Sequence, residues 1–295
     1  MGIVLVDVFG SGLGNLLFMH HVGYAHCKRL AQQANTDIGA DNQLWMQSEY
    51  HDPKRPNISV YADLFRHVRL VNQADKAALY QQGNTLYYHE PCFPYLPIPV
   101  ASNIVLEGYF QSYKYFIEYR HEIRDLLWGN VSTLMQVVIC EYESISKNSE
   151  TGLPCMPTVC MHVRRGDYLN LPQYHPTQPD SYYLDALRHI EARVGTVQVL
   201  LFSDDTPYAK EWSKKTLGNR SVYIDDTHPD TGALSCLMLM SLCDHFIIAN
   251  SSLSLNAYYL RANEDALLCA PANWFGPLGP RFNIHDIVPP SALVL

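Results

Sequence analysis

The chain has 295 residues, 47% of them hydrophobic, and a formal net charge of −8 at pH 7. This length accommodates one large domain or two of ordinary size. The negative charge argues against broad nucleic-acid binding, which needs a basic surface, but it does not exclude a small basic pocket for a nucleotide.

The eight cysteines form no Cys-x-x-Cys pair, and their spacing fits no zinc pattern. Several lie inside apolar runs, as buried thiols do, which favours a reducing compartment over a disulfide framework. We recognise no signal peptide before the first predicted strand and no apolar stretch long enough to span a bilayer. The expected protein is therefore soluble and cytoplasmic.

The first half opens like an α/β unit: a strand at 2–9, a glycine-rich turn at 10–15 and a helix at 16–33. The stretch 41–99 contains several prolines and short apolar pieces, and we expect irregular excursions around a binding cleft there. A strand at 103–110 and helices at 115–128 and 131–145 complete this half.

The segment 147–154 is polar, contains glycine and proline, and is the best linker candidate. It divides the chain into predicted α/β domains at 1–150 and 151–295. The second domain alternates strands and helices. Strands are predicted at 158–163, 197–203, 221–224, 245–249 and 266–270, and helices at 181–194, 232–243 and 253–261. This rhythm predicts parallel sheets covered by helices, in two halves that face each other across a cleft with ligands at the carboxyl ends of the strands.

The most informative motif is His162-Val-Arg164-Arg165-Gly166-Asp167-Tyr168, which follows a predicted strand. Arginine offers a planar fork of donors that matches phosphate oxygens. The alternative is a buried Arg–Asp ion pair at a strand end, with the glycine only making a turn. The motif alone does not decide between the two.

A glycine-rich turn, Gly10-x-Gly12-x-Gly14-Asn15, follows the first strand. It lacks the full Gly-x-Gly-x-x-Gly spacing, and no acidic residue follows at the distance typical of a dinucleotide site. A cradle for an anion or a sugar at a helix N-terminus fits better. A tight turn would need glycine too.

Two polar groups follow later strands. Ser203-Asp204-Asp205 could accept hydrogen bonds from a base or ribose, bind a divalent metal, or cap a helix. Asn250-Ser251-Ser252-Leu253-Ser254 could bind a diphosphate at a helix N-terminus or simply cap that helix. A third acidic group, 225–230, is typical of a loop before a helix. The chain shows no nucleophile elbow, which disfavours covalent hydrolysis.

Together, these segments resemble the α-1,2-fucosyltransferases of glycosyltransferase family eleven and, more distantly, the α-1,6- and protein O-fucosyltransferases. The resemblance covers nearly the whole chain in order. Its elements are Gly12-Leu-Gly-Asn15, Gly108-Tyr-Phe-Gln-Ser112, His162–Tyr168, Phe202-Ser-Asp-Asp205, Met240-Ser-Leu-Cys243, Asn250-Ser-Ser252 and Ala270-Pro-Ala-Asn-Trp-Phe275. Two departures stand out: Leu16 replaces the usual glutamine, and Leu255-Asn256 follow Ser254 where the family has two tryptophans.

The resemblance implies a GT-B-like fold of two Rossmann-like halves and inverting, metal-independent transfer of L-fucose from GDP-fucose to a glycan hydroxyl. The linkage would be α-1,2 on galactose or a related sugar. The C-terminal half would bind the donor, and the N-terminal half would shape the acceptor side. No cofactor is expected, and GDP-fucose would be a co-substrate. No nucleic-acid partner and no membrane-spanning segment are expected.

Site roles follow from the resemblance. Arg164 would offset the charge on the departing GDP, with His162 and Asp167 orienting it. The donor set is Gly12, Gly14, Asn15, Arg164, Arg165, Gly166, Ser203, Asp204, Asp205, Asn250, Ser251, Ser252 and Ser254. The acceptor-side set is Glu107, Tyr109 and Gln111.

Candidates for the base that would deprotonate the acceptor are Asp7, Glu107 and the His20–His21 pair, and a weak base or none would suffice if the transition state is oxocarbenium-like. Two alternatives to GDP-fucose transfer also stay open. One is a glycosyltransferase with a changed donor or acceptor. The other is a GDP- or glycan-binding module of a larger glycan-building protein, with weak or altered donor specificity.

Overall fold

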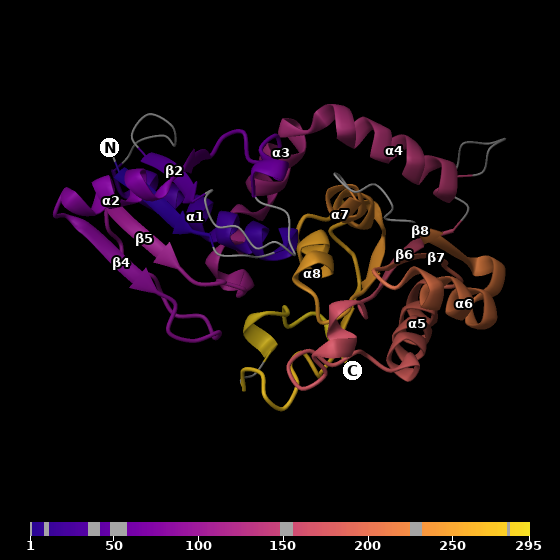
Figure 1. Cartoon of the computed structure of the whole chain (residues 1–295). Helices are drawn as coiled ribbons and strands as arrows, with labels where there is room; N and C mark the ends of the chain where they lie inside the picture. Colours follow the sequence, from indigo (N-terminus) through magenta and orange to yellow (C-terminus); the bar gives the residue numbers. More distant parts are fainter. Residues whose placement is uncertain are drawn as a thin grey trace. The chain divides into compact units, whose positions relative to one another are not determined.

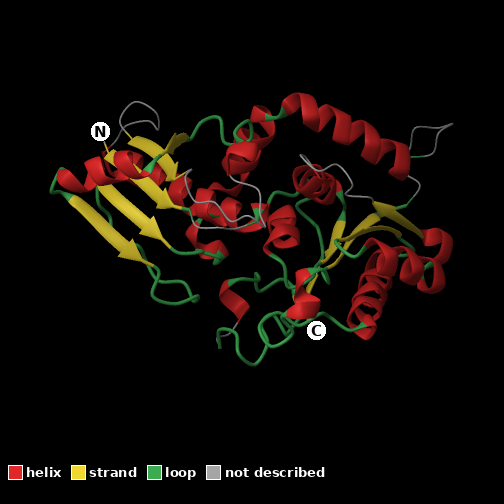
Figure 2. Cartoon of the chain, in the orientation of Figure 1, coloured by secondary structure: helices red, strands yellow, loops and turns green. Residues whose placement is uncertain are grey.

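The computed structural model describes residues 2–8, 12–34, 42–47, 58–147, 156–224, 232–281 and 284–295. The chain divides into two compact units, Met1–Val131 and Ser132–Leu295. Each unit contains a parallel sheet accompanied by helices (Figure 1; Figure 2). The predicted α/β class with parallel sheets is confirmed.

The division between the units comes earlier in the chain than the predicted boundary after residue 150. Helix α4 (Ser132–Ser146) follows α3 (Arg120–Asn130) almost directly, but it packs on α7 (Gly232–Leu242). Those packing contacts place α4 in the second unit. Of the predicted linker at 147–154, only Lys147 is among the described residues.

The first sheet has the strand order β3-β2-β1-β5-β4. Its strands are β1 (Gly2–Asp7), β2 (Asn42–Gln47), β3 (Arg69–Val71), β4 (Thr85–His89) and β5 (Asn103–Glu107). Helix α1 (Leu13–Ala34) packs on β1 and β2. Leu79 of α2 (Gln73–Gln81) packs with Leu5 and Val105 of the sheet.

The expectation of irregular structure at 41–99 is wrong for much of its described part. Three strands of the first sheet and helix α2 lie there. These strands have three to six residues each. Runs this short, separated by loops, do not show enough periodicity to be recognised from the sequence.

The second sheet has the order β11-β10-β9-β6-β7-β8. Its strands are β6 (Thr158–Val163), β7 (Gln198–Ser203), β8 (Ser221–Ile224), β9 (His245–Ile247), β10 (Leu268–Ala270) and β11 (Leu293–Val294). The remaining helices of this unit are α5 (Asp180–Val194), α6 (Thr206–Thr216) and α8 (Ser252–Tyr259). The predicted strands and helices of this half are all present, and α6 and β11 are additional.

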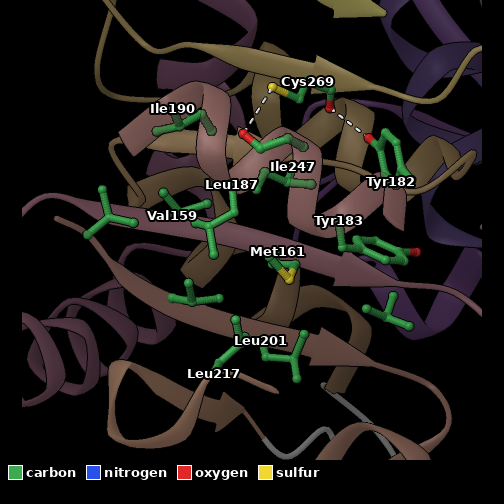
Figure 3. Packing of buried hydrophobic residues seen from close by; sticks show 14 of the residues in the cluster. Val159, Met161, Tyr182, Tyr183, Leu187, Ile190, Leu201, Leu217, Ile247 and Cys269 are labelled. Carbon is green, nitrogen blue, oxygen red and sulfur yellow. Dashed lines mark hydrogen bonds between the residues drawn. The ribbon is translucent and has the colours of Figure 1, made fainter. Parts of the chain in front are cut away.

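Strand β6 is buried along its whole length and has a core on both sides. Met161 packs with Tyr183 and Leu187 of α5 in the cluster shown in Figure 3. On neighbouring β9, Phe246 makes an edge contact with Tyr258 of α8. Because the sheet is parallel and covered on both faces, the carboxyl ends of β6, β7 and β9 open at one edge.

A chain of three hydrogen-bonded imidazoles, two of them fully buried and one partly buried, lies in the first unit. Asn130 Nδ2 donates to His67 Nδ1 at 2.9 Å, His67 Nε2 lies 2.7 Å from His20 Nε2, and His20 Nδ1 lies 3.1 Å from His21 Nδ1. Each link is satisfied when every ring is neutral, with one donor and one acceptor nitrogen. Burial accordingly lowers the pKa of His67 to about 4. Burial also lowers to about 4 the pKa of His26, which lies on the same helix as His20 and His21.

We expect this unit to lose stability as the pH falls from about 6.5 to 4. In that window His67 and His26 bind protons in the unfolded chain but stay neutral in the folded chain. Each of the two sites therefore lowers the free energy of unfolding by on the order of 2 kcal/mol. Urea unfolding at pH 7 and pH 4.5 measures the loss. His67→Gln should reduce it, whereas His121→Gln, at an exposed position of the same unit, should not. Equal pH dependence in both variants would contradict the assignment.

Candidate functional site

Arg164 lies just past β6, where two carboxylates hold its guanidinium group. Nη2 donates to Asp167 Oδ1 at 2.6 Å, and Nη1 lies 3.0 Å from Asp204 Oδ2. Burial alone would lower the pKa of Arg164, but the two aspartates outweigh it and raise that pKa above its usual value. The side chain keeps 27% exposure. A fixed cation with accessible donors can bind an anion in a defined geometry.

Arg165 turns to a different set of partners. Its Nε donates to Asp205 Oδ2 at 2.9 Å, and its Cζ lies 3.7 Å from the ring centroid of Tyr208 on α6. Asp205 Oδ1 also accepts from the Tyr208 amide and caps α6. The sequence leaves open whether this motif binds phosphate or forms a structural ion pair. The contacts of Arg165 correspond to the ion pair.

Gly166 allows the arginine loop to pack against β7. Asp204 Oδ1 accepts from the Arg165 amide at 2.8 Å, so this one carboxylate holds both arginine residues. A Cβ atom on Gly166 would lie 2.3 Å from Asp204 Oδ2. No side chain fits there without displacing Asp204, and glycine is therefore required by close approach.

His162 is buried at the end of β6 with 4% exposure. Burial, and then the charge of Arg164, lower its pKa to about 4 against the opposing effect of Asp204. The ring is therefore neutral at pH 7. Its Nδ1 atom is buried and has no hydrogen-bond partner. A neutral ring next to Arg164 adds no positive charge to a cluster in which two arginines face three aspartates.

Three predicted donor serines near the ends of β7 and β9 cap or brace the backbone. Ser203 Oγ accepts from the Asp205 amide at 3.1 Å, and Ser251 Oγ caps α8 through the Leu253 amide at 3.3 Å. Ser254 Oγ donates to the Ser251 carbonyl. Ser252 opens α8 and is partly exposed. These contacts correspond to the capping role that the sequence allowed as an alternative.

The Asn250 side chain links two loops by hydrogen bonds. Its Nδ2 donates to the carbonyls of Pro176 and Trp274 at 3.1 and 3.0 Å, while its Oδ1 is buried without a partner. Tyr168 Oη donates to the Asn250 carbonyl at 2.9 Å, and Arg164 Cζ lies 5.3 Å from the Tyr168 ring. The sequence predicts no role for Tyr168, and its place in the motif next to Asp167 is the signal that could have indicated one.

The remaining predicted donor residues lie in the first unit. The Gly12 carbonyl accepts from the amides of Asn15 and Leu16 and starts α1, which also includes Gly14. Asn15 Oδ1 accepts from Gln111 Nε2 at 2.9 Å. The glycine turn and the Gly-Tyr-Phe-Gln element, far apart in the sequence, are thus joined directly.

The acceptor-side candidates gather where β1 and β5 end. Asp7 pairs across the two strands with Glu107 in register, and Lys76 of α2 forms an ion pair with Asp7. Glu107 Oε2 lies 3.3 Å from His89 Nδ1. Tyr109 stacks on Phe93 with 6.2 Å between centroids. His20 and His21 are fully buried, which places them out of reach of an acceptor, so Asp7 and Glu107 remain as base candidates.

Two properties hold for the described ranges of the chain. Within them, no group of three or more His, Cys, Asp or Glu side chains could hold a metal ion. The acidic group 225–230 lies outside these ranges. Within them, too, the helices are all too short or too polar to cross a membrane.

Comparisons with known proteins agree with the family resemblance. A sequence model of glycosyl transferase family 11 matches residues 86–276. An O-antigen biosynthesis glycosyltransferase of Escherichia coli, WbnK, is 25% identical over 92% of this chain and 95% of its own. An alpha-1,2-colitosyltransferase of Escherichia coli is 23% identical over 93% of each chain.

Among solved structures, the fold is similar to that of POFUT1 in complex with GDP-fucose. The TM-score is 0.50 with 10% sequence identity, over 99% of this chain and 98% of that one. At this identity the likeness concerns the fold, and it supports the GT-B-like architecture expected from the sequence.

Proposed function

Because the chain belongs to glycosyl transferase family 11, we propose that it transfers L-fucose from GDP-fucose to a hydroxyl group of an acceptor glycan. The proposed linkage is α-1,2 on galactose or a related sugar, with inversion at the anomeric carbon. The observation that carries the proposal is the Arg164 guanidinium, braced by Asp167 and Asp204 at the carboxyl end of β6.

The departing group in this reaction is GDP, and its β-phosphate gains negative charge as the glycosidic bond breaks. Arg164 is the proposed group that offsets this charge. Since Asp167 and Asp204 already orient its guanidinium plane, little reorganisation is needed at the moment of reaction. The N-terminus of α8, with Ser251 and Ser252, adds amide dipoles of the same sign.

Deprotonation of the acceptor is assigned to the carboxylates at the ends of β1 and β5. Asp7 is held in an ion pair by Lys76, whereas among the described residues the ion-pair partner of Glu107 is His89, whose side chain is 65% exposed. Glu107 is therefore the better candidate for general base, because an acceptor hydroxyl can replace the weaker partner.

A second candidate is transfer of a colitosyl group. It is favoured by the likeness to the alpha-1,2-colitosyltransferase and by Leu255-Asn256, which stand where the fucosyltransferases have two tryptophans. Both side chains are fully buried in α8, so this departure changes packing behind the donor region.

One assay separates these proposals. The protein is incubated with GDP-fucose, GDP-colitose and UDP-galactose, with and without galactose-terminated acceptors, and with or without EDTA. We expect acceptor-dependent GDP release from GDP-fucose, unchanged by EDTA, and a product with inverted anomeric configuration by NMR. Faster turnover of GDP-colitose would favour the second candidate. Tight GDP binding with no turnover would favour a binding module, and loss of activity with EDTA would contradict metal independence.

A further inference from the structure

Glu90, which directly follows β4, has a role that the sequence did not indicate. Its Oε2 accepts hydrogen bonds from two consecutive amides, those of Tyr109 at 2.8 Å and Phe110 at 2.9 Å. Its own amide donates to the Glu107 carbonyl at 2.8 Å. The carboxylate therefore binds two amides of the turn that follows β5, and the backbone of the same residue is paired with the last residue of β5.

The turn is shaped to fit this carboxylate. A Cβ atom on Gly108 would lie 2.4 Å from the Glu90 Cβ, so only glycine allows the approach. Phe110 adopts a positive φ of 49°, which is unfavourable for a bulky residue. A single backbone conformation that costs energy persists only where surrounding contacts hold it. Here, the two amide bonds to Glu90 are such contacts.

The same turn carries the acceptor-side residues. Tyr109 stacks on Phe93, and Gln111 binds Asn15 in the first turn of α1. A change in the direction of the Tyr109 and Phe110 amides would move the side chains of Tyr109 and Gln111, because the same few backbone angles set the positions of these two side chains. Glu90 thus controls the position of Tyr109 and the link between the Gly-Tyr-Phe-Gln element and α1.

The surroundings of Glu90 are poor in compensating charge. Its Oε1 is buried without a hydrogen-bond partner, and no cationic side chain of the described residues pairs with it. The titratable groups that face it are Tyr88 on β4 and Tyr115, whose pKa values are both raised, chiefly by burial. The Glu107 carboxylate is directed to His89. Burial raises the pKa of Glu90 to about 7, against the two amide bonds, which lower it.

We propose that Glu90 is a positioning residue for the acceptor glycan, whose carboxylate holds the turn 108–111 in the shape that presents Tyr109 to the acceptor. This inference rests on the function proposed above. It separates Glu90, which acts through the turn, from Arg164, which would act on the donor.

The test compares Glu90→Gln with Glu122→Gln, which neutralises an exposed glutamate of the same unit. At pH 8, we expect Glu90→Gln to raise the KM for acceptor about tenfold, with the Kd for GDP changed less than twofold. The Tyr109 and Phe110 amides should exchange hydrogen about tenfold faster. In the wild type, acceptor KM should rise as the pH falls from 8 to 6 and Glu90 becomes protonated. Glu90→Gln should show no such rise.

Stability provides an independent control. The folded pKa of Glu90 lies above that of the unfolded chain, so the folded state binds the extra proton and loses stability as the pH rises from about 4.5 to 7. Glu90→Gln removes this cost, and its Tm at pH 8 should equal or exceed that of the wild type.

Two results would overturn the proposal: unchanged amide exchange at Tyr109 and Phe110, or equal weakening of GDP and acceptor binding together with a lower Tm. If the wild type transfers no sugar at all, the proposed function fails. The exchange measurement then still decides whether Glu90 holds the turn.

Discussion

Replacing Arg164 by alanine should reduce kcat for sugar transfer by about 10³-fold, the magnitude typical of a preorganised group that stabilises transition-state charge. The guanidinium is placed by Asp167 and Asp204, whereas Arg165, the other arginine at the end of β6, pairs with Asp205. GDP affinity should also fall, because GDP, the proposed leaving group, carries the phosphates that Arg164 would contact. Steady-state kinetics and calorimetric titration with GDP measure the two effects.

Two variants control for this result. Arg188→Ala removes an exposed arginine of α5 that pairs with Asp185 and should leave kcat unchanged. Arg164→Lys keeps the charge but loses the planar fork, and it should recover only part of the rate. Near-normal turnover in Arg164→Ala would remove this residue from the leaving-group role and leave it as a structural ion pair.

Gly166→Ala should lower kcat/KM by about 100-fold, although it adds only a methyl group. That methyl would lie 2.3 Å from Asp204 Oδ2 and displace the carboxylate that holds Arg164 and the Arg165 amide. Misplacement of a catalytic group by about 1 Å can cost this much. The Tm should change little, because the loop is partly exposed.

The matched control is Gly129→Ala in α3, where a Cβ atom meets nothing within 4 Å. Alanine is favoured over glycine in a helix by about 1 kcal/mol, so this variant should be active and at least as stable as the wild type. Activity of Gly166→Ala within twofold of wild type would show that Asp204 can move without consequence.

Much of the fold could be predicted from the sequence. The strand at 158–163 and the one at 221–224 have the predicted bounds, and most other predicted elements agree within a few residues. The failures are local and have a cause. The strands between 42 and 89 are short, and their identity depends on pairing rather than on their own pattern: β2 pairs with β1, β4 with β5, and β3 with β2.

The candidate site was only partly predictable. The motif from His162 to Tyr168 was recognised because its residues are consecutive. Glu90 was missed because nothing in its neighbourhood marks it: its partners, Tyr109 and Phe110, lie 19 and 20 residues away along the chain. The chemistry of imidazole makes the His20–His21 pair a candidate for proton transfer, but both side chains are fully buried, a property that the sequence does not show.

The sequence by itself determined the α/β class, the order of the motifs and the family, because composition, periodicity and consecutive motifs are local properties of the chain. Only the tertiary structure decided which residues contact one another. Arg165 meets Asp204 and Asp205 across 39 and 40 residues, and Gln111 meets Asn15 across 96. Such pairs form where parallel strands bring distant segments to one sheet edge. Charge and burial at that edge then decide which groups are braced, neutral or available for chemistry.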